Sequence, residues 1–95
     1  MKRNDSPLKD VLNQWMKGDK YRDRLLKIRI EKIWHESWGH AFGRHTRDIH
    51  YGRGILYIHM DSAVLRHELN LQRELLLERL NDALGEEVIK EVKLR

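Results

Sequence analysis

The chain has 95 residues, of which 36% are charged and 40% are hydrophobic, and its formal net charge is +4. This composition is typical of one globular domain over residues 1–95, with residues 1–5 expected to be disordered. The absence of cysteine excludes disulfides and cysteine-based zinc sites, and no apolar run approaches the roughly 20 residues that a membrane span needs. We therefore expect a cytoplasmic protein without a membrane partner.

The segment after Ser6 predicts a first amphipathic helix. Ser6 suits the N-cap, Pro7 suits the first helical position, and Gly18 fits just past the end. The apolar side chains that recur at helical spacing are Leu8, Val11, Leu12 and Trp15. We expect Trp15 to belong to the core.

A second helix is predicted over residues 20–38, which form the most basic segment of the chain. Its apolar positions are spread broadly, so we expect it to contact more than one neighbour. The candidate phosphate-binding side chains in this helix are Lys20, Arg22, Arg24, Lys27 and Arg29. Three of them share one polar stripe with Glu31. A solvated helix face and a phosphate-binding face both fit this stripe.

A β-hairpin is predicted next, from residues 46–51 and 55–60, with Arg53 and Gly54 as a two-residue loop. Apolar residues occupy odd positions in the first strand and even positions in the second, so odd must pair with even. This register sets Tyr51 opposite Leu56 and Ile49 opposite Ile58, with a type I′ or II′ turn. Around the hairpin, the further candidates for nucleic-acid contact are Arg44, Arg47 and Arg53.

One long helix should follow the N-cap residues Asp61 and Ser62 and continue without a break to Gly85. One apolar row contains Leu65, Leu69, Leu76, Leu80 and Ala83, with Gln72 inside it. A second row offers a candidate partner-binding surface made of Val64, Leu71 and Leu75 with Arg66 and Arg73. Either the helix is packed between layers, or this second row faces a partner.

The chain should end in a third strand, predicted over residues 88–94 at a sheet edge, where Lys90 would discourage further pairing. The expected fold class is therefore α+β. The order is α-α-β-β-α-β, with a three-stranded mixed sheet covered by helices. The third strand should run parallel to the second, but its place beside the first or the second strand stays open.

The sequence does not predict an enzyme, a cofactor, a metal site or a small-molecule substrate. His35, His40, His45 and His50 are spaced five apart, which does not place them on one helix face. The two glycines of residues 52–54 lie between strands, which is not the context of a phosphate-binding loop.

Charge is unevenly divided along the chain. Residues 1–60 contain 13 Lys and Arg against 7 Asp and Glu, whereas residues 61–95 contain 6 against 8. A basic part opposed to an acidic part indicates that one face of the molecule is positively charged. Nucleic acid is one class of partner that binds such a face.

Several residues combine in a fixed order along the chain. They are Trp34 and Gly39, His45-Thr46, Gly52 and Gly54 of the hairpin, Asp61-Ser62, Leu80-Asn81 and Ala83-Leu84-Gly85. With this order and spacing, the chain resembles the DciA family over about residues 8–94. The resemblance implies a KH-like fold and a role with the bacterial replicative helicase, as an operator or loader with affinity for single-stranded or tailed DNA. The chain lacks the Gly-x-x-Gly loop with which KH domains clamp RNA.

Three hypotheses remain. The first is a DciA-like accessory of the replicative helicase that binds DNA through the basic helix and hairpin. The second is a KH-like RNA-binding module, and the third is a domain that binds only protein.

Overall fold

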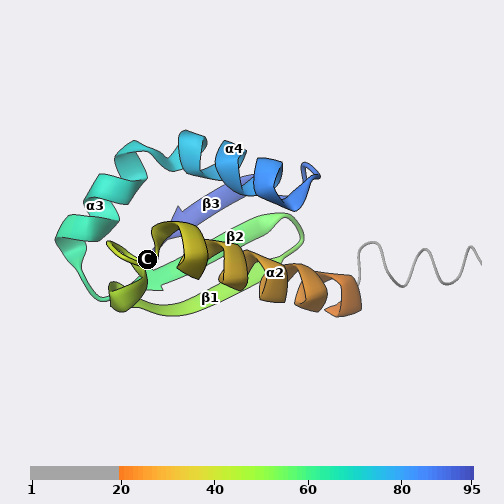
Figure 1. Cartoon of the computed structure of the whole chain (residues 1–95), viewed down its shortest axis with the longest axis horizontal. Helices are drawn as coiled ribbons and strands as arrows, with labels where there is room; N and C mark the ends of the chain where they lie inside the picture. The colour runs from red at the N-terminus through yellow and green to blue at the C-terminus, as the bar shows by residue number, and fades with distance from the viewer. Residues whose placement is uncertain (1–19) are drawn as a thin grey trace, which may run out of the picture.

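The computed structural model describes residues 20–95. The predicted first helix, Trp15 and residues 1–5 lie outside this range. The described elements are α2 (Lys20–Trp38), a 3-10 turn η1 (Gly43–His45), β1 (Thr46–Gly52), β2 (Ile55–Met60), α3 (Ala63–Leu71), α4 (Arg73–Leu84) and β3 (Glu91–Leu94) (Figure 1). The α+β class and the mixed three-stranded sheet are confirmed.

Helix α2 has the predicted bounds and buries a narrow face. Leu26, Ile30 and Trp34 recur every four residues, so they lie on the side of the helix that meets the sheet, and all three are buried. The Trp34 indole stacks on Trp38, with ring centroids 5.4 Å apart. The remaining apolar residues of α2 include an exposed row of Tyr21, Leu25 and Ile28.

The β1–β2 hairpin has the predicted register. Tyr51 pairs with Leu56 and Ile49 with Ile58 in an antiparallel ladder. Arg53 and Gly54 have φ angles of 52° and 84°. Two successive positive φ angles are the signature of a type I′ turn, whose twist matches that of the strands. The hairpin prediction is therefore confirmed at residue level.

Strand β3 lies beside β2 and parallel to it, so the sheet order is β1-β2-β3 and β3 is an edge strand as predicted. The predicted start at residue 88 is wrong, because the strand begins at Glu91. The backbone amides of residues 88–90 form other hydrogen bonds in place of strand pairing. The Lys90 amide donates to the Gly54 carbonyl at 2.7 Å, and Asn81 of α4 binds the two residues before it.

The single long helix predicted over residues 63–84 is also wrong. The chain turns at Gln72 (φ −113°, ψ 24°) and divides into α3 and α4, which meet at an angle in Figure 1. Leu69 and Leu76 on either side are buried while Gln72 between them is exposed. The bend lets both segments bury leucines on a sheet that is only three strands wide.

One face of the sheet carries the hydrophobic core. Ile49, Leu56, Ile58 and Val92 point from the strands into the same cluster as the buried leucines of α3 and α4. Residues on the opposite face, such as His50 and Tyr57, are exposed or half-buried. None of the helices within residues 20–95 is long and apolar enough to cross a membrane.

Candidate nucleic-acid interface

The five candidate site residues of α2 are divided between two flanks of the helix. Arg22 and Arg29 are seven residues apart, which places them on the same flank. The Arg22 guanidinium forms an ion pair with Glu86 at 2.7 Å, and Arg29 donates to the Leu84 carbonyl at 3.1 Å. These two predicted site residues are therefore directed toward the end of α4 and take part in packing α2 against it.

Lys20, Arg24 and Lys27 form the other flank, which we call the basic flank. Their spacing of four and three residues places them in one row. Lys27 forms an ion pair with Glu31 at 3.5 Å. Among residues 20–95, the side chains of Lys20 and Arg24 take part in no ion pair, and both are exposed. This flank presents positive charge that the described part of the fold does not neutralise.

The three arginines around the hairpin lie at opposite ends of β1. Arg53 is in the type I′ turn, where its amide donates to the Asp23 carboxylate of α2 at 3.2 Å. This bond holds the hairpin tip against the first turns of α2, close to the basic flank. Arg44 in η1 and Arg47 in β1 lie at the far end of the strand.

Arg47 is held by Asp61, the residue that follows β2. Asp61 also forms a hydrogen bond with His45 Nδ1 at 2.9 Å. The His45 hydrogen bond, followed by Arg47, lowers the pKa of Asp61 below its usual value. The eight basic residues predicted to bind nucleic acid thus fall into three groups: Arg22 with Arg29, the basic flank with Arg53 near it, and Arg44 with Arg47.

The predicted partner-binding residues are also divided by the bend at Gln72. Leu71 and Leu75 line one hollow of about 430 Å³ at the α3–α4 junction, together with Arg73. Their side chains are 71% and 42% exposed. Val64 is exposed but does not line this hollow, and Arg66 turns inward to donate to the Met60 carbonyl at 3.1 Å.

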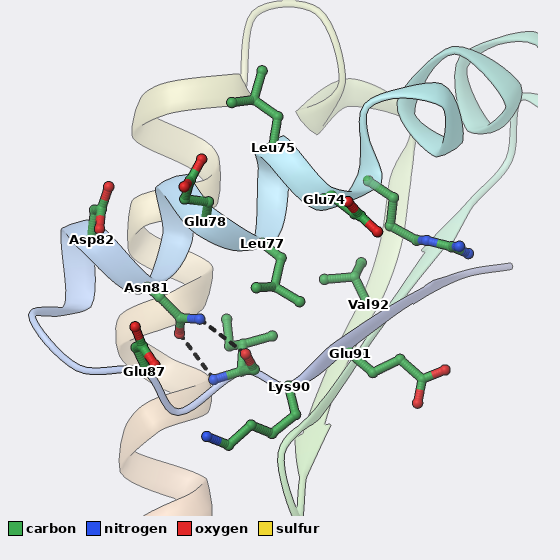
Figure 2. A pocket seen from close by; sticks show the side chains of 12 residues that line it. Glu74, Leu75, Leu77, Glu78, Asn81, Asp82, Glu87, Lys90, Glu91 and Val92 are labelled. Carbon is green, nitrogen blue, oxygen red and sulfur yellow. Dashed lines mark hydrogen bonds between the residues drawn. The ribbon is translucent and has the colours of Figure 1, made fainter.

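A hollow of about 850 Å³ lies between α4 and β3, and we call it the acidic groove (Figure 2). Leu77, Ile89 and Val92 contribute apolar atoms to its lining. Two cations, Arg73 and Lys90, also line it. They are outnumbered by the carboxylates of Glu74, Glu78, Asp82, Glu87 and Glu91. Such a surface repels phosphate.

Asn81 is the one buried polar residue in the described part of the chain, and the sequence reasoning gave it no role. Its side-chain oxygen accepts from the amides of Val88 and Ile89, at 3.1 and 2.9 Å, and its nitrogen donates to the Ile89 carbonyl at 2.9 Å. Figure 2 shows this amide reaching from α4 to the segment before β3. Asn81 therefore fixes the connection that forms one wall of the acidic groove.

Other residues behind the family resemblance are structural as well. The Trp34 indole donates to the Thr46 hydroxyl at 3.0 Å, which in turn donates to the Phe42 carbonyl at 2.8 Å. Ser62 accepts from the Leu65 amide at 3.2 Å and so caps α3. Gly85 ends α4 in the left-handed conformation, with a φ of 79°. The spacing of these residues along the sequence reflects the fold. It does not by itself identify the residues that contact a ligand.

Residues 20–95 contain no candidate metal site, because no group of three or more His, Asp or Glu side chains among them is placed to hold an ion. His50 and His59 share the outer face of the sheet, as the predicted register requires.

Comparison with known proteins gives a family match. The model of the family described as Dna[CI] antecedent, DciA, matches residues 7–94, which is nearly the whole chain. Searches of the curated proteins and of the solved structures find no match. Membership of this family implies a helicase-loader-like role in DNA replication. The family is not known as a family of enzymes. On this match, the chain belongs to the DciA family.

Proposed function

We propose that this protein binds single-stranded or tailed DNA through its basic flank and acts as an accessory to the replicative helicase. The observation that carries the proposal is the exposed charge of Lys20 and Arg24, which no ion pair within residues 20–95 engages, beside Lys27. Each such cation that meets a phosphate releases condensed counterions, which favours binding. Arg53, held near α2 through Asp23, extends the same surface toward the hairpin tip.

The acidic groove supports this orientation of DNA. Its carboxylates lie on α4 and around β3, whereas the basic flank lies on α2, which packs over β1. Because β1 and β3 are opposite edges of the sheet, a phosphate backbone is attracted to one edge and repelled from the other.

For the helicase contact we propose the hollow at the α3–α4 junction. Leu71 and Leu75 expose apolar surface there beside the cation Arg73. Exposed apolar side chains bordered by charge are typical of protein-binding surfaces. This hollow is separate from the basic flank, so DNA and helicase need not compete for one surface.

DNA binding is tested by titrating the purified protein against a fluorescent single-stranded oligonucleotide at several salt concentrations. We expect binding that weakens with salt, with a slope of about −0.7 in log Kobs against log salt for each phosphate contacted. A matched RNA oligonucleotide tests the second hypothesis, because a protein that reads the 2′-hydroxyl favours RNA. No binding at low salt would contradict the DNA-binding proposal.

The helicase contact is tested by pull-down of purified replicative helicase with a Leu71→Asp/Leu75→Asp variant. Loss of helicase binding with unchanged affinity for DNA is the expected result. A Val64→Asp variant is the matched control, since Val64 is as exposed as Leu71 but does not line the hollow. Helicase binding that survives the double substitution would place the contact elsewhere.

A further inference from the structure

The outer face of the sheet is a regular surface that lies opposite the hydrophobic core within residues 20–95. Tyr57 lies at its centre, on the middle strand β2. The register places His50 of β1 and Lys93 of β3 on either side of it. His59 follows two positions along β2 and therefore projects from the same face. An aromatic ring flanked by nitrogen-bearing side chains thus occupies the middle of an open sheet.

The ring of Tyr57 is accessible to a flat group. The guanidinium carbon of Arg95 already lies 5.0 Å from the ring centroid. The ring also borders a hollow of about 370 Å³ that is lined by His50, Tyr51, Gly52, Tyr57 and His59. A planar group of several atoms has room in this hollow beside the aromatic surface, and the guanidinium shows that the ring face accepts a stacked partner.

The charges around Tyr57 suit an anionic chain that carries aromatic bases. Lys93 and Arg95 bring two cations to this face. Of the two carboxylates on it, Asp48 is engaged by His50, with 3.3 Å between Oδ2 and Nε2, and Glu91 lies at the end of the face nearest the hairpin turn. Arg47 and Arg53 lie at the two ends of the adjoining β1. Lys93 and Arg95 therefore lie beside the ring, Arg47 is already engaged by Asp61, and the ring itself offers a stacking surface.

We propose that this face is a stacking platform on which a base of single-stranded nucleic acid lies on the ring of Tyr57. The inference rests on the proposed function and adds the surface that contacts the bases, which the basic flank does not provide. Single-strand binders combine cationic tracks for the phosphates with aromatic side chains for the bases. A paired duplex offers no base face to Tyr57, so the platform selects single strands.

The experiment compares wild type with Tyr57→Leu and Tyr57→Phe in titrations against a single-stranded oligonucleotide and a matched oligonucleotide with abasic sites. Leucine suits a strand but cannot stack on a base, so we expect Tyr57→Leu to raise the Kd for the intact oligonucleotide roughly 5- to 150-fold. Tyr57→Phe keeps the ring and should bind as wild type does. The advantage of intact over abasic DNA should be lost in Tyr57→Leu.

A second readout uses wild type itself, so its decisive outcome does not depend on how well a variant folds. An oligonucleotide that contains the fluorescent base 2-aminopurine should be quenched when wild-type protein stacks on it, and the quenching should be absent with Tyr57→Leu. Absence of quenching in the wild type at saturation would overturn the platform.

The outcomes separate this inference from the function on which it rests. If wild type binds DNA and Tyr57→Leu binds equally well, the platform is overturned and the basic flank remains the binding surface. If Tyr57→Leu loses the helicase and keeps DNA, the face belongs to a protein partner and the platform is again overturned. If wild type binds no single strand at low salt, both proposals fail together.

Discussion

The two edges of the sheet differ in charge and in what their charged residues do. At the β1 edge, Lys20 and Arg24 of α2 are exposed and form no ion pair within the described residues. At the β3 edge, carboxylates gather in the acidic groove over a wall that Asn81 holds in place. One edge presents positive charge that the described residues do not pair, whereas the other presents mainly negative charge.

The formal net charge of +4 does not reveal this separation of positive from negative residues, but the fold does. The basic part of the sequence forms α2 and β1, and the acidic part forms α4 and β3. Because β2 lies between β1 and β3, the two parts are placed at opposite edges. The position of a charged side chain, and whether another residue already engages it, therefore describes the surface better than the net charge does.

Reversing the basic flank should have the largest effect on binding. In a Lys20→Glu/Arg24→Glu/Lys27→Glu variant, phosphate would meet three carboxylates in place of three cations, and we expect affinity for single-stranded DNA to fall more than about 100-fold at low salt. The check is the fluorescent titration, with circular dichroism to confirm that the domain is folded.

A matched reversal of the acidic groove tests whether position or net charge decides this result. A Glu78→Lys/Asp82→Lys/Glu87→Lys variant should bind DNA at least as tightly as wild type. Combining both triple substitutions restores the net charge of +4. If the combined variant binds as wild type does, net charge alone governs binding and the two edges are equivalent.

Asn81→Ala should have the largest effect on stability. It removes three hydrogen bonds and leaves the buried amide and carbonyl of Ile89 without their partner. We expect a loss of about 2–4 kcal/mol in the free energy of unfolding, measured by denaturant titration. Asn70→Ala is the matched control, because Asn70 is exposed and accepts only from Arg73 at 3.3 Å. Its cost should stay within about 0.5 kcal/mol, and equal losses in the two variants would contradict the role of Asn81.

Arg24 and Arg22 provide a finer comparison on one helix. Arg24→Gln removes an exposed charge of the basic flank and should reduce the salt slope of binding by about 0.7. Arg22 is engaged with Glu86, so Arg22→Gln should change this slope less and cost about 0–1 kcal/mol of stability. A larger change of slope in Arg22→Gln would move the binding surface to the α4 side of the helix.

The smallest expected effect concerns pH. The pKa of Asp61 is lowered from its usual value of 3.8 by the His45 hydrogen bond and by Arg47. A lowered pKa means that the carboxylate stabilises the fold above pH 3.8, and that this contribution is lost as the pH falls through the lower folded pKa. Denaturant titrations at neutral and acidic pH should show a weaker acid dependence in Asp61→Asn than in wild type. Glu68→Gln, which is exposed on α3, should keep the wild-type dependence.

Much of the local structure could be predicted from the sequence, because its signals are contained in short stretches. The odd-with-even alternation fixed the pairing of Tyr51 with Leu56, and the residues Arg53 and Gly54 predicted the turn. The bounds of α2 followed from its apolar and basic periodicity. For the candidate site, the stripe of Lys20, Arg24 and Lys27 was also visible as a helical spacing.

The long-range arrangement could not be predicted in this way. Nothing near Gln72 marks a helix end, and the bend arises because Leu69 and Leu76 must both reach a narrow sheet. The partner of Arg29 is the carbonyl of Leu84, which is 55 residues away. A spacing rule cannot show that this cation is engaged while Arg24 forms no ion pair in the described part of the chain.

By itself, the sequence determined the α+β class, the hairpin register, the edge position of the last strand and the uneven charge. Backbone propensity, turn chemistry and alternation act over a few residues, so they can be read along the chain. Only the tertiary structure decided the place of β3 beside β2, the division of the helix at Gln72, the role of Asn81 and the engagement of particular cations. Those features depend on which distant segments share a core, and burial against distant segments is a property of the whole fold.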